Sequence, residues 1–189
     1  THPDADHIAG LVEVLEMYEV EHVYLNGGQS DTATFGNLMT GIDNEGADVT
    51  ILVRGDSITL GNLTIEVLHP GELTGDSNKD SLVLLLGCGN VEVLLSGDAE
   101  NASEQEMIAA EVLPDVDVLK VGHHGSHSST SQGFLDVVKP EIAVISAGLD
   151  SQYGHPHQEV VDRLLEAQVQ IVLTDTTDMD DTVRLTSDC

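Results

Sequence analysis

Short apolar segments of strand length alternate along this chain with segments whose apolar residues recur at helical spacing. Residues 8–17, for example, carry apolar side chains on one face of an amphipathic helix. Only turn residues separate the apolar segments 81–86 and 90–96, which indicates a hairpin. Hairpins set among alternating strands and helices predict an α/β fold of the αββα type, a sandwich of two mixed sheets with outer helices, rather than a doubly wound parallel sheet.

The same patterns predict the bounds of each element. Ser103, with Glu106 three residues later, is expected to cap the third helix. The expected helices are residues 8–17, 32–42, 103–112, 131–138 and 156–167. The expected strands are residues 21–26, 48–53, 57–68, 81–86, 90–96, 116–121, 142–146, 169–175 and 182–186.

Length and composition fit one domain. A chain of 189 residues with 40% hydrophobic residues is large enough to bury about 70% of its unfolded surface. We find no linker or repeat and expect a single domain over residues 1–189. No apolar run reaches the 18 residues that a membrane helix needs, and the first residues lack a signal-peptide pattern. We therefore expect a soluble chain that makes no membrane contact of its own.

The charge balance is strongly acidic. Thirty-four Asp and Glu residues against six Lys and Arg residues give a net charge of −28 at pH 7. Such repulsion destabilises a compact fold in dilute buffer, whereas at about 1 M salt the Debye length falls to about 3 Å. The composition is typical of a protein from a high-salt organism, with an acidic mesophilic protein as the alternative. Disorder is disfavoured because apolar periodicity continues to the end of the chain.

Histidine and carboxylate residues are the candidate metal ligands, since two cysteines without metal-type spacing are too few for a thiolate site. Seven of the nine histidines fall into three short clusters. These clusters are His2 with His7, His123 with His124 and His127, and His155 with His157.

The first cluster places four nitrogen and oxygen ligands within six residues, immediately before a helix. His2, Asp4, Asp6 and His7 are the hard and borderline ligands that a pair of divalent cations about 3.5–4 Å apart requires. The alternative is that Asp4 or Asp6 only caps the helix and that the histidines are exposed.

Further candidates stand at the ends of expected strands, where distant segments can meet at one sheet edge. Asp98 follows the strand at 90–96, and His123 and His124 follow the next one. Adjacent residues of an extended strand point to opposite faces, so we favour His123 as the one direct ligand. His124 would then either support the ligands or contact the substrate. His155 either joins the site or is a surface imidazole at a helix start.

Two residues beside this second cluster are catalytic candidates. Ser126 supplies a hydroxyl donor, and Lys120 is one of few basic residues, although it could equally cover a sheet edge. A serine or cysteine nucleophile is disfavoured because the chain has no Gly-x-Ser-x-Gly segment and because glycines flank Cys88. A paired-carboxylate glycosidase would leave the clustered histidines unexplained.

Four motifs, in order, resemble the metallo-β-lactamase superfamily and, within it, the soluble hydrolase domain of ComEC-type DNA-uptake competence proteins. They are Thr-His-Pro-Asp-Ala-Asp-His-Ile-Ala-Gly-Leu at residues 1–11, Leu-Leu-Ser-Gly-Asp-Ala-Glu at 94–100, Leu-Lys-Val-Gly-His-His-Gly-Ser at 119–126, and Ser-Ala-Gly through Tyr-Gly-His-Pro-His at 146–157.

The resemblance implies an αββα fold and a first ligand group of His2, Asp4, Asp6 and His7, with Asp98 as the bridging carboxylate. Asp4 stands where the superfamily's motif usually has histidine, which leaves zinc and manganese open for the two divalent ions. The superfamily's mid-chain histidine has no clear counterpart: His69 lies in the right region with altered spacing, and Asn78 or Ser81 is the alternative. Family members also have strands before the first motif, so we expect an N-terminally incomplete domain, and the resemblance implies an extracytoplasmic or cell-surface location.

The leading hypothesis is a metal-dependent hydrolase that cleaves phosphodiesters, DNA above all, through a metal-activated water. Its expected metal ligands are His2, Asp4, Asp6, His7, Asp98 and His123, and its expected catalytic residues are Asp6, His124, His155, Lys120 and Ser126. A histidine of the second or third cluster would protonate the leaving group. The alternatives are a hydrolase of a small ester or phosphodiester, and a non-catalytic metal-binding module that presents an acidic surface to a partner.

Overall fold

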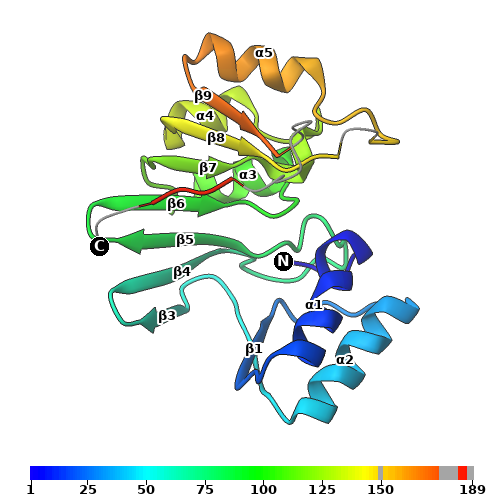
Figure 1. Ribbon diagram of the computed structural model, residues 1–189. Coiled ribbons are helices and arrows are strands. Elements are labelled where there is room, and N and C mark those ends of the chain that lie inside the picture. The colour runs from blue at the N-terminus through cyan, green and yellow to red at the C-terminus, as the bar shows by residue number, and fades with distance from the viewer. Residues whose placement is uncertain (149–150, 175–182, 187–189) are drawn as a thin grey trace.

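The computed structural model describes residues 1–148, 151–174 and 183–186, which form a mixed α/β fold (Figure 1). Its helices are α1 (Ala5–Met17), α2 (Ala33–Glu45), α3 (Asn101–Ala109), α4 (Gln132–Val138) and α5 (Gln158–Glu166), with a 3-10 turn, η1, at Gly122–Gly125. Its strands are β1 (His22–Leu25), β2 (Asp48–Ile51), β3 (Ser57–Leu60), β4 (Leu63–His69), β5 (Val83–Cys88), β6 (Val91–Leu95), β7 (Val118–Lys120), β8 (Ile142–Ile145) and β9 (Gln170–Leu173).

Seven of these strands form one mixed sheet in the order β3-β4-β5-β6-β7-β8-β9. Neighbours from β3 to β6 are antiparallel, and neighbours from β6 to β9 are parallel. The expected hairpin joins β5 to β6 through Gly89 and Asn90. The single strand expected at 57–68 is instead two, because Gly61 and Asn62 form a turn between β3 and β4. The part of the expected strand at 182–186 that is described, residues 183–186, has no regular structure, and residue 182 lies outside the described residues.

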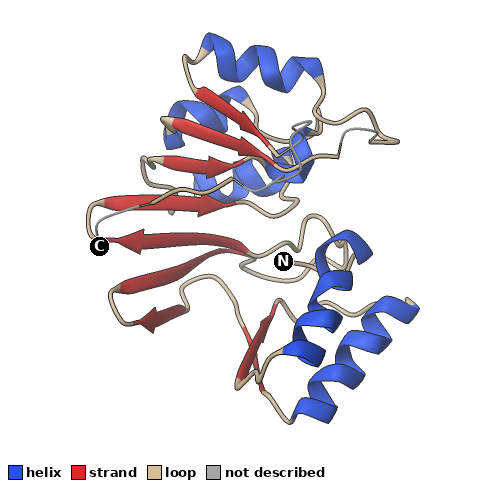
Figure 2. Cartoon of the chain, viewed as in Figure 1, coloured by secondary structure: helices blue, strands red, loops and turns tan. Residues whose placement is uncertain are grey.

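The helices divide into two groups (Figure 2). α1 and α2 lie together near the parallel pair β1 and β2, and their apolar faces share a core that includes Ile8, Leu38 and Ile42. α3, α4 and α5 lie at the parallel end of the large sheet, where Phe134 and Leu164 are buried in the main core. The predicted α/β class, with a mixed sheet covered by helices, is therefore confirmed. The second sheet, expected to be mixed, is in the described residues a parallel pair.

Two of the five described helices begin at a residue whose side chain caps the first turn. The hydroxyls of Thr32 and Ser131 accept hydrogen bonds from the backbone at the first turns of α2 and α4. The cap predicted at Ser103 is wrong, because α3 begins at Asn101 and the buried Ser103 hydroxyl donates to the Lys79 carbonyl. Among the described helices, none is long and apolar enough to span a membrane.

The parallel strands determine where the chemistry can lie. β6, β7 and β8 run in one direction, so their carboxyl ends meet at the same sheet edge. The loops that follow them carry Asp98, His124 and His155. The N-terminus reaches this edge too, because the Leu82 N–H, just before β5, donates to the Thr1 carbonyl over 2.9 Å.

Candidate metal centre

The start of α1 brings the first candidate ligands to the sheet edge. Asp4 occupies the N-cap position, but in the described structure its carboxylate makes no capping hydrogen bond. Its Oδ1 instead accepts a 2.6 Å hydrogen bond from the Ser77 hydroxyl. The capping alternative thus does not account for Asp4, which leaves it available to a ligand.

Asp98 and His2 are buried and are held together by one hydroxyl group. The Asp98 backbone N–H donates to Ser81 Oγ over 3.0 Å. The same Oγ lies 3.0 Å from His2 Nδ1. Ser81 therefore positions a carboxylate and an imidazole that are far apart in the sequence.

His123 and His124 lie in the η1 turn, where both have left-handed backbone conformations with φ of 47° and 55°. The extended backbone that we expected at these two residues is wrong, because both lie in the left-handed region of a 3-10 turn. A Cβ at Gly125 would lie 2.6 Å from the Pro156 Cβ. Glycine at this position lets Pro156 pack directly against the turn. Left-handed conformations of non-glycine residues are uncommon and gather at functional sites.

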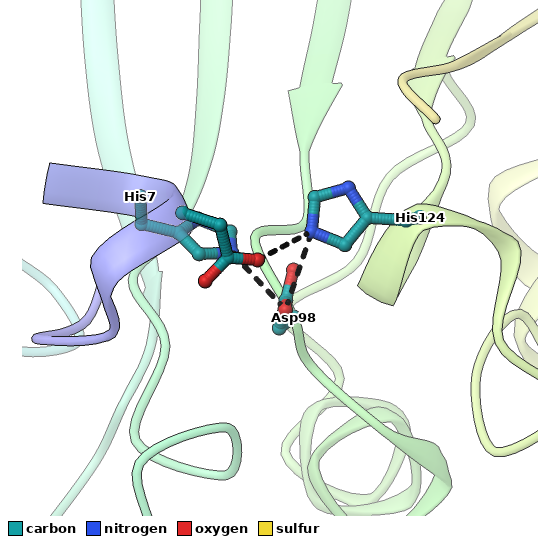
Figure 3. A group of neighbouring side chains, drawn as sticks. His7, Asp98 and His124 are labelled. Carbon is teal, nitrogen blue, oxygen red and sulfur yellow. Dashed lines mark ion pairs between the residues drawn. The ribbon is translucent and has the colours of Figure 1, made fainter. Parts of the chain in front are cut away.

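Asp6, His7, Asp98 and His124 form one compact group, in which one ligand atom from each lies within 4.8 Å of the others. Asp98 Oδ2 is 3.1 Å from His7 Nε2 and 3.6 Å from His124 Nε2. His124 Nε2 is also 3.3 Å from Asp6 Oδ2. Figure 3 shows His7, Asp98 and His124 reaching toward one point from α1, from the loop after β6 and from the η1 turn.

His2 and Asp4 extend this group on the side of His7. The His2 and His7 ring centroids are 4.1 Å apart. His2 Nε2 lies 3.6 Å from Asp4 Oδ2. A second pair of imidazole and carboxylate donors thus adjoins the four-residue group, which is the donor density that two divalent cations require.

Hydrogen bonds on the far side of the rings set the histidine tautomers. His124 Nδ1 lies 2.7 Å from the Ser146 carbonyl oxygen, which can only accept, so Nδ1 carries the proton and Nε2 presents a lone pair. Glu100 does the same for His123, at 3.1 Å from Nδ1. His123 Nε2, however, is 3.9 Å from Asp98 Oδ2. The geometry places His124 in the four-residue group and His123 at its margin, whereas we had favoured His123. A role for His123 as a metal ligand stays a prediction.

The residues present fit a bound divalent metal ion. Five buried side-chain atoms in the described residues lack a hydrogen-bond partner, and four of them belong to this centre. Buried polar atoms are normally paired, because an unpaired one loses its hydration without compensation. Divalent cations would satisfy these atoms, since a carboxylate oxygen and an unprotonated imidazole nitrogen each carry a lone pair. These atoms are His2 Nε2, His7 Nε2, Asp98 Oδ1 and His124 Nε2.

Electrostatics keeps two of these groups in the protonation state that metal binding needs. Burial raises the pKa of Asp98, but the contact with His7 and the charges of His7, His124 and Lys120 outweigh it and lower the pKa to about 2. Burial, together with the charge of His7, lowers the pKa of His2 to about 4. At neutral pH the carboxylate is therefore ionised and the His2 ring is neutral.

The lowered pKa of His2 predicts an acid-sensitive fold in the metal-free chain. Between pH 6.5 and about 4 the unfolded state binds more protons at this residue than the folded state does, so stability is lost as pH falls through that window. The loss is at most about 3 kcal/mol. In urea titrations with a chelator, His2→Asn should remove this pH dependence and His22→Asn, an exposed control, should retain it. Parallel curves for all three proteins would contradict the assignment.

A cavity of 680 Å³ opens beside the centre. Asp6 and His124 line it together with His155, Tyr153 and the backbone after β8. The structure therefore brings His155 to the site, although the sequence left it between a site residue and a surface imidazole. Burial, followed by the charges of neighbouring histidines, lowers the pKa of His155.

The other predicted residues lie farther from this cavity. Lys120 is partly buried, and its Nζ donates to the Gly97 carbonyl over 3.3 Å, which supports the loop that carries Asp98. Burial lowers the pKa of Lys120. The Ser126 hydroxyl contacts that of Ser128 at 2.9 Å, so it belongs to the support of the turn. Catalytic roles for Lys120 and Ser126 stay predictions.

Residues outside the predicted clusters also shape the centre. Glu100 and Ser146 orient the two adjacent histidines, and the sequence offered no signal for Ser146 because its backbone carbonyl makes the contact. Glu100 lies two residues after Asp98, and that proximity is a signal that could have been used. His69 is buried and donates through Nε2 to the Lys79 carbonyl over 2.6 Å, which is a structural role.

Comparison with known proteins agrees with this geometry. Residues 1–148 match the family model of the metallo-beta-lactamase superfamily. The chain is 34% identical over 178 residues to ComE operon protein 3 of Bacillus subtilis, covering 93% of this chain and 23% of that protein. It is 33% identical over 165 residues to Recombination protein 2 of Haemophilus influenzae, covering 87% of this chain and 19% of that one. The chain thus spans less than a quarter of the length of these relatives.

A crystal structure of CmlA, a diiron β-hydroxylase from Streptomyces venezuelae, shares the fold with a TM-score of 0.59 at 16% identity, covering 90% of this chain and 42% of that one. The resemblance to competence proteins of the ComEC type is confirmed by the named relatives, which include Competence protein ComA of Neisseria gonorrhoeae. From its match over residues 1–148 and the fold just described, we conclude that this chain belongs to the metallo-β-lactamase superfamily.

Proposed function

We propose that this domain is a metal-dependent phosphodiesterase that cleaves DNA. The observation that carries the proposal is the convergence of four unpaired buried ligand atoms beside an open cavity. Membership of the superfamily supports a metal-dependent hydrolase in general. The names of two relatives, Recombination protein 2 and Competence protein ComA, refer to recombination and competence, processes that act on DNA, and they support DNA as the substrate. The proposed location is the cell envelope, by analogy with competence proteins.

The residues of the centre divide into three groups in this proposal: metal ligands, a proton donor and groups that orient the histidines. His2, Asp4, Asp6, His7, Asp98 and His124 would hold two divalent ions, zinc or manganese. When bound, such ions supply a water nucleophile at neutral pH and neutralise charge on the phosphate. His155 lines the same cavity as Asp6, and its protonated imidazole would give a proton to the leaving oxygen. Glu100 and the Ser146 carbonyl hold the two adjacent imidazoles in place.

Substrate competition tests the proposal. We expect the protein, loaded with zinc or manganese in high salt, to cleave single-stranded DNA and bis(p-nitrophenyl) phosphate and to leave p-nitrophenyl acetate intact. His124→Ala should lower phosphodiester cleavage by about a hundredfold, because one ligand is lost, whereas His22→Ala, at an exposed histidine beside Asp48, should leave it unchanged. Preferential cleavage of the acetate would favour a small-ester hydrolase. Metal uptake without turnover of any substrate would favour the non-catalytic module.

A further inference from the structure

Tyr153 presents an aromatic face at the rim of the cavity. Its side chain lines the cavity and is 69% exposed, in a chain with only three tyrosines, two phenylalanines and no tryptophan. The Tyr153 and His155 ring centroids are 5.8 Å apart, with 29° between the planes. An exposed aromatic ring at a cavity rim leaves one face free to contact a planar guest.

The ring of His155 continues this arrangement inward. Its centroid lies 6.4 Å from that of His124, and the two planes differ by only 16°. His124 belongs to the metal centre. Roughly parallel rings therefore lead from the candidate ligands, through His155, to Tyr153 in solvent. The Tyr153 ring is thus separated from His124 by the ring of His155 alone.

The cations of the chain offer little for phosphate binding. Nucleic-acid affinity ordinarily comes from Lys and Arg that neutralise phosphates, and the net charge here is −28. In the described part of the chain, five of the six basic residues already contact an acceptor within the protein. These contacts are Arg54 with Glu106, Lys79 with Asp76, Lys120 with the Gly97 carbonyl, Lys139 with Asp115, and Arg163 with the Thr130 carbonyl.

We propose that Tyr153, supported by His155, is the stacking platform for a nucleobase next to the phosphodiester at the metal centre. This inference rests on the proposed function and specifies its substrate as a strand with unpaired bases, because a base within a duplex cannot lie on the ring. Stacking needs no positive charge and survives high salt. It therefore contributes affinity for the strand that an acidic surface cannot provide through phosphate contacts.

Binding of fluorescein-labelled single-stranded oligo(dT), measured by anisotropy in 1 M KCl with a chelator that prevents cleavage, tests the platform without turnover. Each base that stacks on an aromatic ring gains affinity from that contact, so Tyr153→Ala should raise Kd about tenfold. Tyr153→Phe, which keeps the ring, should stay within about twofold. Tyr18→Ala, at a tyrosine that is 63% exposed at the end of α1, is the matched control and should bind like the unaltered protein.

An abasic oligonucleotide of equal length separates stacking from other effects. Tyr153→Ala should leave its binding unchanged, and in cleavage assays the variant should raise KM for oligo(dT) while kcat changes little. Equal losses on both oligonucleotides, or no loss on oligo(dT), would overturn the platform. If the protein binds oligo(dT) in a Tyr153-dependent way but cleaves neither strand, the platform stands and the proposed nuclease activity fails. If instead Tyr153→Ala cleaves oligo(dT) with an unchanged KM, the proposed nuclease activity stands and the platform fails.

Discussion

Asp98→Asn is expected to strip the protein of metal and to reduce phosphodiester cleavage about a thousandfold. Asp98 is the carboxylate that faces both His7 and His124, at 3.1 and 3.6 Å from their Nε2 atoms. Asparagine keeps the shape but removes the charge that offsets the cations, and charge stabilisation by bound metal contributes several kcal/mol to such reactions. Plasma mass spectrometry on protein purified without chelators should find about two equivalents of zinc or manganese in the unaltered chain.

Asp48→Asn is the matched control, since it also removes one negative charge but lies 85% exposed beside His22. It should keep both metal content and activity. Iron belongs in the same measurement, because a structural neighbour is a diiron enzyme. Full metal content in Asp98→Asn would place the metal elsewhere and would remove the basis of the proposed mechanism.

Salt should have the second largest effect, acting on the whole fold. With 34 acidic and six basic residues, the folded chain concentrates negative charge that low salt leaves unscreened. Raising KCl from 0.1 to 2 M should increase the melting temperature by at least about 10 °C, which corresponds to several kcal/mol for a domain of this size. Differential scanning calorimetry in the presence of a chelator separates this effect from metal binding.

Surface neutralisation provides the control. The triple variant Glu13→Gln, Glu16→Gln and Glu19→Gln removes three charges from exposed positions in and just after α1. It should raise the melting temperature at 0.1 M KCl and leave it nearly unchanged at 2 M, where the repulsion is already screened. A gain of equal size at both salt concentrations would show that helix propensity, rather than charge, is responsible. A melting temperature independent of KCl would contradict the high-salt interpretation of the composition.

Local sequence patterns predicted most of the fold. The helical spacing of residues 8–17 and the hairpin around Gly89 appear close to where they were expected, because periodicity and turn chemistry act over a few residues. Capping of α3 was mispredicted because a distant contact competes for the same side chain: Ser103 bonds to the Lys79 carbonyl. The extended backbone expected at His123 failed for a similar reason, since packing of Pro156 on Gly125 accompanies a left-handed turn.

The sequence by itself determined the kinds of ligand, their order along the chain, the mixed α/β class and the acidic surface, because composition and short-range periodicity encode these properties. Only the tertiary structure decided which atoms meet. It selected His124 for the four-residue group through the Ser146 carbonyl, joined His2 to Asp98 through Ser81, and brought Tyr153 beside His155. These choices depend on contacts between segments far apart in sequence, and the packing of β6, β7 and β8 at one sheet edge, not any local propensity, creates those contacts.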